Sequence, residues 1–355
     1  MARIGRWLGR ADSSAVDFPD GAGPAGLLTR HLLLVPSTVT AEQVDELVRS
    51  RVPHCELAAT GEVPLGRRSK ISGPFELSME DAVDAGVPMP WTIAYALQAP
   101  VEREDPPLPG TDDRDGLAHA FPEGMPWREE GRGLQLLVAL ARRLHGAVRV
   151  AGASSGSLIQ PDPDRSVDVL IHSPNWLEPQ VVHGLVARIL PAAQLAVDGQ
   201  DWQGPDPEAY SGARIAHDTR HAPLDPHVLA TLHAAADEVD LANLRAEDTI
   251  DAFAVVAEIA PDLTDGAIEV LVHVSDPGEP SVAGQDWGQY PFVNYEVRWA
   301  CPQPEERERR LPSSPYLAGR ERIRPTLTDV ARALVEVTGG VVTDEDGFWL
   351  DRYTL

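Results

Sequence analysis

The chain has 355 residues and a formal net charge of −25, from 55 acidic and 30 basic side chains. Its hydrophobic fraction of 43% and charged fraction of 24% are typical of a globular protein, and its length allows two domains of ordinary size. Because so acidic a protein repels phosphate groups, we expect no binding to nucleic acid or to an anionic membrane. No apolar run in the sequence is long enough to span a bilayer.

Several features of the sequence favour a cytoplasmic protein. The first residues are basic but lack the apolar core of a secretory signal. The two cysteines, Cys55 and Cys301, are far apart and cannot form a disulfide framework. Lys70 is the only lysine, and this bias towards arginine, together with abundant alanine, glycine and proline, indicates a GC-rich bacterial genome.

Two segments of the chain are similar in sequence. Residues 31–58 align with residues 169–196 at an offset of 138, and both segments indicate a strand, a proline turn, an amphipathic helix and a second short strand. A second match, at an offset of 194, relates residues 131–150 to residues 325–344. The growth of the offset predicts an insertion at about 197–250 in the second half.

These matches predict an α+β protein made by tandem duplication. Each half is expected to hold a mixed or antiparallel sheet packed by one or two helices. The predicted organisation is an N-terminal arm, a first repeat and a second repeat that carries the insertion, at residues 1–25, 26–163 and 164–355.

In the first half, a leucine-rich strand is expected at 31–35 and is followed by a helix. Thr40 and Gln43 have the spacing of a capping box at the start of this helix. A second short strand is expected near 54–58. The other expected elements are strands at 75–79 and 91–98, a long loop at 100–132, a helix at 134–144, a hairpin of 147–150 with 157–160, and a boundary between halves at 161–165.

In the second half, the helix at 179–189 repeats the first helix, and Asp225-Pro226 indicates the start of another helix. The strands segregate from the helices, which favours α+β over a doubly wound parallel sheet. The remaining expected elements are strands at 167–171, 252–260, 267–274 and 292–300, a helix at 328–337, and a closing hairpin with its turn at 344–347.

One motif suggests a hydrolase. Residues 152–156 fit G-x-S-x-G, in which Ser154 would be the nucleophile. The motif needs a strand before the serine and a helix after it, whereas residues 157–160 indicate a strand. A flexible hairpin tip explains the glycines and serines equally well.

Four histidines between His217 and His233 suggest a metal site, because imidazole and carboxylate groups are ordinary zinc ligands. His217 and His221 are the best candidates, since they would share one helical face. No third ligand has motif spacing, and a polar loop is the alternative. We therefore expect no bound metal and no cofactor.

Two short echoes indicate a binding surface. Gly-Gln-Asp-Trp occurs at 199–202 and again at 284–287. A loop tryptophan beside a carboxylate can stack on a ligand or anchor a protein partner, so Asp201, Trp202, Asp286 and Trp287 are candidate binding residues. The same tryptophans could instead cover the ends of the sheets.

The sequence therefore favours a non-catalytic intracellular protein that binds a protein partner or a small ligand. The alternative is a hydrolase that uses Ser154 or a metal held by histidines. Sequence alone identifies no ligand, and the chain resembles no family through motifs specific enough to name one.

Overall fold

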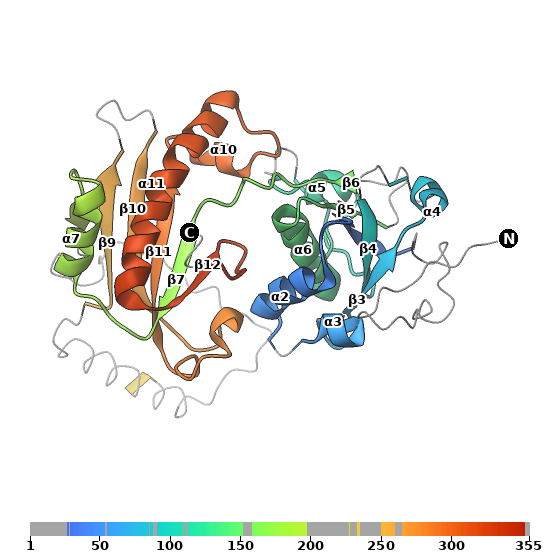
Figure 1. Ribbon diagram of the computed structural model, residues 1–355, viewed down its shortest axis with the longest axis horizontal. Coiled ribbons are helices and arrows are strands. Elements are labelled where there is room, and N and C mark those ends of the chain that lie inside the picture. Colours follow the sequence, from blue (N-terminus) through green and yellow to red (C-terminus); the bar gives the residue numbers. More distant parts are fainter. Residues whose placement is uncertain are drawn as a thin grey trace.

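The computed structural model describes residues 29–53, 55–84, 86–87, 91–108, 113–151, 158–196, 250–259 and 265–351, and the single residues 27, 110, 227, 233 and 234. The predicted N-terminal arm lies outside the described residues, as does most of the predicted insertion at 197–250. Figure 1 shows two lobes, with the first half of the chain in one and the second half in the other.

The described part of the first lobe contains one antiparallel sheet with the strand order β2-β3-β4-β1-β5-β6. Its central strand, β1, carries an unbroken apolar run that is buried on both faces of the sheet. The strands are β1 (His31–Pro36), β2 (Glu62–Pro64), β3 (Lys70–Glu76), β4 (Trp91–Gln98), β5 (Ala147–Arg149) and β6 (Leu158–Ile159).

The described part of the second lobe contains a second antiparallel sheet with the order β12-β7-β11-β10-β9-β8. Alternate residues of β9 and β10 are buried, as expected when one face of a sheet packs on helices. The strands are β7 (Val169–Ser173), β8 (Gln194–Ala196), β9 (Ala252–Glu258), β10 (Ala267–Ser275), β11 (Phe292–Ala300) and β12 (Val341–Asp344). The predicted α+β class is confirmed by this architecture.

A pair of helices packs on one face of each sheet, α2 with α6 in the first lobe and α7 with α11 in the second (Figure 1). The first-lobe helices are α2 (Ala41–Arg51), α3 (Leu57–Thr60), α4 (Met79–Asp84), α5 (Leu117–Ala120) and α6 (Arg128–Arg143). Those of the second lobe are α7 (Pro179–Ile189), the short 3-10 helix η1 (Pro280–Val282), α10 (Pro304–Glu308) and α11 (Ser314–Thr338). Within the described ranges, no helix combines the length and the apolar composition needed to cross a membrane.

The start of α2 confirms the predicted capping box. The Thr40 side chain accepts from the Gln43 amide, and the Gln43 side chain accepts from the Thr40 amide. Val44 and Val48 then face the core with no exposed surface. In α7, Val182 and Val186 are buried in the same way, one and two turns into the helix.

Four local predictions were wrong. The second short strand expected near 54–58 is the helix α3, and the strand expected at 75–79 ends at Glu76 because Met79 begins α4. The long loop at 100–132 contains α5 and the first turns of α6. The helix α11 begins fourteen residues before the predicted 328 and continues through Pro325, because its apolar face packs on the second sheet on both sides of the proline.

One aromatic side chain joins the two lobes. Phe348 follows β12 of the second sheet, yet it is fully buried in the hydrophobic core of the first lobe, with Val44 and Leu137 among the members of that core. The Asp344–Phe348 turn therefore reaches from one half into the other (Figure 1).

The substitution Phe348→Ala is expected to destabilise the protein by about 3–5 kcal/mol, because it removes a fully buried ring and leaves a cavity in the first core. Urea unfolding followed by circular dichroism measures this change. The matched control is Tyr290→Ala, since Tyr290 is 61% exposed and its loss should change stability by no more than about 0.5 kcal/mol. Equal stability of F348A and Y290A would contradict the joining role of Phe348.

Candidate functional site

The turn after β12 is closed by its own first residue. One oxygen of Asp344, Oδ1, accepts hydrogen bonds from the amides of Asp346 and Phe348, at 3.0 and 2.9 Å. Gly347 has a φ of 77°, and a Cβ there would lie 3.0 Å from the Arg51 side chain of α2. This geometry needs glycine, and it presents Glu345 and Asp346 to the first lobe.

A buried arginine of the first lobe receives this turn. Arg142, in α6, has a side chain that is 3% exposed and pairs with Asp346 of the turn and with Asp115 before α5. Burial by itself lowers the pKa of Arg142, but Asp346 and Asp115 outweigh burial and raise it. The Arg51 side chain adds a hydrogen bond to the carbonyl of Asp346.

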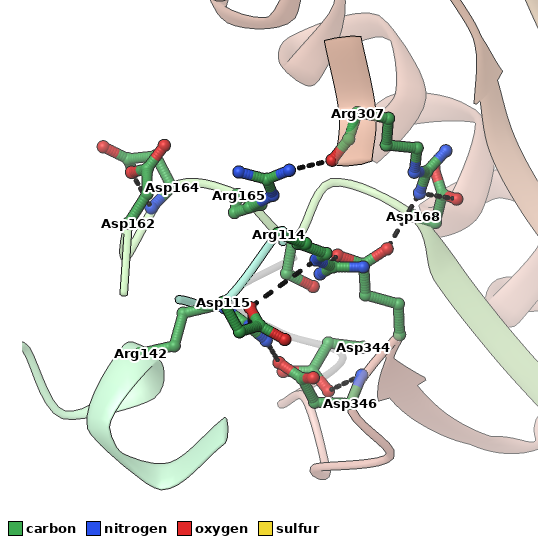
Figure 2. A network of polar contacts seen from close by, with 12 residues as sticks. Arg114, Asp115, Arg142, Asp162, Asp164, Arg165, Asp168, Arg307, Asp344 and Asp346 are labelled. Carbon is green, nitrogen blue, oxygen red and sulfur yellow. Dashed lines mark hydrogen bonds and ion pairs between the residues drawn. The ribbon is translucent and has the colours of Figure 1, made fainter. Parts of the chain in front are cut away.

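A second set of ion pairs continues from the neighbouring residue of the turn. The Glu345 carboxylate accepts a hydrogen bond from Arg114 of the first lobe at 2.5 Å and another from Arg307 of α10 at 2.8 Å. Arg307 also pairs with Asp168, which accepts from the Trp299 amide. Figure 2 shows how Arg114, Arg142 and Arg307 gather around the turn from three separate elements.

A cavity of about 360 Å³ lies beside this network, between the two lobes. Its walls come from the end of α6, the segment that joins the sheets, α11 and the turn. The residues that matter for its chemistry are Arg142, Arg143, Asp168, Arg324, Asp344 and Asp346. The cavity is therefore a polar space shared by both halves.

Asp344 has the most unusual charge state in this cavity. Its residue is 6% exposed, and burial raises the pKa of its carboxyl group to about 6, with nearby Asp346 adding to the shift. The two backbone amides bound to Oδ1 and the positive charge of nearby Arg143 oppose the rise. A carboxyl group with such a pKa changes its charge near neutral pH, which is common at functional sites.

Most of the predicted site residues lie outside the described residues: Ser154, Asp201, Trp202, His217 and His221. Their predicted roles stay predictions. Among the described residues, no group of three or more histidine, cysteine, aspartate or glutamate side chains is arranged to hold a metal ion.

Trp287 and Asp286 are described and lie on the loop before β11, and neither takes part in the ion pairs of the network. The Trp287 ring is half-buried and packs against Phe292, with ring centroids 5.8 Å apart, as a covering side chain would. Asp286 is exposed and lines a shallow hollow of the loop. Their predicted role in binding a partner stays a prediction.

A buried histidine–glutamate pair in the first lobe has no signal in the sequence. His31 Nε2 lies 3.0 Å from Glu130, and His31 Nδ1 accepts from the Ala151 amide, so both ring nitrogens are engaged. Burial, together with Arg103 and Arg149, lowers the pKa of His31 to about 4. A neutral ring with no free nitrogen is suited to holding β1 against α6.

Sequence reasoning also missed the network between the lobes. Its members are scattered along the chain and follow no motif spacing. The one available signal was the Asp-Glu-Asp-Gly turn, which the sequence identified only as a hairpin turn.

Comparisons with family models, curated proteins and solved structures find no match to this chain.

The raised pKa of Asp344 predicts a pH-dependent stability. The folded protein holds this proton more tightly than the unfolded chain, whose value is 3.8, so Asp344 stabilises the fold at low pH. That contribution is lost as the pH rises through about 6. Asp344→Asn keeps an acceptor for both amides and stays neutral, so wild type should lose up to about 3 kcal/mol relative to D344N between about pH 4 and pH 7.

Urea unfolding across this pH range measures the difference. The control variant is Asp329→Asn, which makes the same chemical change at an exposed position of α11. Parallel pH profiles for wild type and D344N would show that Asp344 has an ordinary pKa.

Proposed function

We propose that this protein is a non-catalytic binding protein that holds a small polar ligand in the cavity between its two halves. The observation that carries the proposal is the cavity of about 360 Å³, which both halves line and which contains the buried carboxyl group of Asp344. Its volume falls within the range usual for small-molecule sites, and such sites often lie between domains.

The uncommitted groups of the cavity indicate the chemistry of the ligand. Asp168 and Asp346 are engaged by arginines, and Arg324 donates to the backbone carbonyls of Asp164 and Ser166. In contrast, Oδ2 of Asp344 receives no hydrogen bond from the described residues.

Arg143 provides the complementary charge. It is exposed, lines the same cavity and forms no ion pair within the described part of the chain. A ligand with an ammonium group for Asp344 and a carboxylate for Arg143 would satisfy both groups. We therefore propose a small zwitterion of the amino-acid type.

Binding is favoured over catalysis by the hydrogen bonds around the cavity. Two hydroxyl side chains, Ser166 and Thr328, line it. Ser166 Oγ is buried without a partner, and no described hydrogen bond links either hydroxyl to a histidine or a carboxylate. Nucleophilic catalysis needs such a link to a base. The hydrolase alternative therefore depends on Ser154, His217 or His221, and the cytoplasmic location and the lack of a cofactor stay predictions.

Tandem duplication is part of this proposal, because a cavity between two related halves follows naturally from it. The strand orders β2-β3-β4-β1-β5 and β9-β10-β11-β7-β12 correspond strand for strand. Leu33 lies opposite Tyr95 and Val148, and Ile171 lies opposite Tyr295 and Val342. Ile171 follows Leu33 by 138 residues and Val342 follows Val148 by 194, the two offsets of the sequence matches.

Isothermal titration calorimetry of the full chain with the free amino acids, one at a time, tests the ligand class. At least one amino acid is expected to bind wild type. Asp344→Asn should weaken that binding about tenfold or more, because a charge-assisted hydrogen bond is lost.

The control is again Asp329→Asn, which should bind as wild type does. Absence of binding by every amino acid at about 10 mM would refute the proposed ligand class, because weaker affinities have no use at ordinary metabolite levels. Equal affinities of wild type and D344N would place the ligand elsewhere.

A further inference from the structure

A second cavity, of about 300 Å³, lies between the lobes next to the ion-pair network. It shares Arg114 and Asp115 with that network. Its other charged lining residues are His119, Asp162, Arg165 and Arg310. The two cavities have no lining residue in common, so this one can be tested separately from the proposed function.

Arg165 is a buried cation that forms no direct ion pair in the described part of the chain, although Asp115, Asp162 and Glu308 act on its charge at longer range. The residue is 4% exposed, and its two terminal nitrogens donate to the backbone carbonyls of Arg307 and Arg309. Its Nε is buried and has no acceptor. Burial and the nearby Arg114 lower the pKa of Arg165, which reflects the cost of holding this charge unpaired.

The two carboxylates of the cavity form their closest ion pairs with other arginines rather than with Arg165. Asp115 is engaged by Arg142, and Asp162 accepts from Arg320 at 2.7 Å and from the Asp164 amide at 3.0 Å. Neither Arg142 nor Arg320 lines this cavity. The closest positive charges to these two carboxylates therefore come from arginines outside the lining of the cavity, Arg142 and Arg320.

Arg310 adds a further positive charge at the mouth of the cavity. It is exposed, and it forms no ion pair with the residues that the structure describes. His119 is exposed on the same wall. In a chain with a net charge of −25, the lining of this cavity holds more arginines (Arg114, Arg165 and Arg310) than carboxylates (Asp115 and Asp162).

We propose that this second cavity binds a phosphate group, either as inorganic phosphate or as part of a small phosphorylated metabolite. Arginine side chains suit phosphate because each guanidinium offers several donors in a planar fork. A bound dianion would supply the direct ion-pair partner that Arg165 lacks. The overall acidity of the chain still disfavours nucleic acid, because a polyanion would also meet the surrounding carboxylates.

Isothermal titration calorimetry of the full chain tests this site with two probes, inorganic phosphate and ribose 5-phosphate, each against a sodium chloride blank of equal ionic strength. Arg310→Ala is the main variant, because an exposed side chain can be removed without loss of folding. Its matched control is Arg67→Ala, which removes one exposed arginine from a loop of the first lobe.

Wild type and R67A are expected to bind alike, and R310A about tenfold more weakly. The variant Arg165→Gln, checked for folding by circular dichroism, should lose binding more completely. Tighter binding of ribose 5-phosphate would identify a phosphorylated metabolite as the ligand, and equal or weaker binding would identify free phosphate. Absence of binding by both probes at about 10 mM, or equal weakening in R310A and R67A, would overturn the proposal.

Discussion

The contact between the two halves depends on the turn from Asp344 to Phe348. Phe348 completes the apolar core of the first lobe, while Asp346 neutralises Arg142, which is buried in the same lobe. A buried guanidinium without its carboxylates would cost several kcal/mol, so the turn and the first lobe require each other. One short segment therefore provides both apolar and ionic contacts between the lobes.

The same turn explains where the candidate sites lie. Asp344 holds the turn closed with one carboxyl oxygen and lines the first cavity between the lobes. Glu345 engages Arg114 and Arg307, and Arg114 is also part of the wall of the second cavity. Charged residues are thus concentrated where the halves meet. The proposed ligand of the second cavity follows from one of them, Arg165, which forms no direct ion pair with the described residues.

Much of the fold was predictable because its signals are local. The Thr40–Gln43 capping box and the apolar positions Val44 and Val48 define α2. In α7, which has proline in its first turn and no side-chain cap, the buried Val182 and Val186 have the same spacing as the two valines of α2. Alternation along β10 and β11 reflects one buried sheet face. The start of α11 was missed because Pro325 is a local helix breaker, whereas packing on the second sheet keeps the helix continuous. Local patterns report local preferences, and tertiary contacts override them when enough apolar surface is buried.

The sequence by itself determined the α+β class and most of the strands and helices, because these follow from periodicity, caps and turns. Only the tertiary structure decided that Phe348 belongs to the core of the other half and that Arg114, Arg142, Asp168 and Arg307 meet around one turn. The physical reason is distance along the chain. The ion-paired side chains of the network are up to 231 residues apart, as in the pair of Arg114 with Glu345. No sequence period can specify which charges will share a buried space between two lobes.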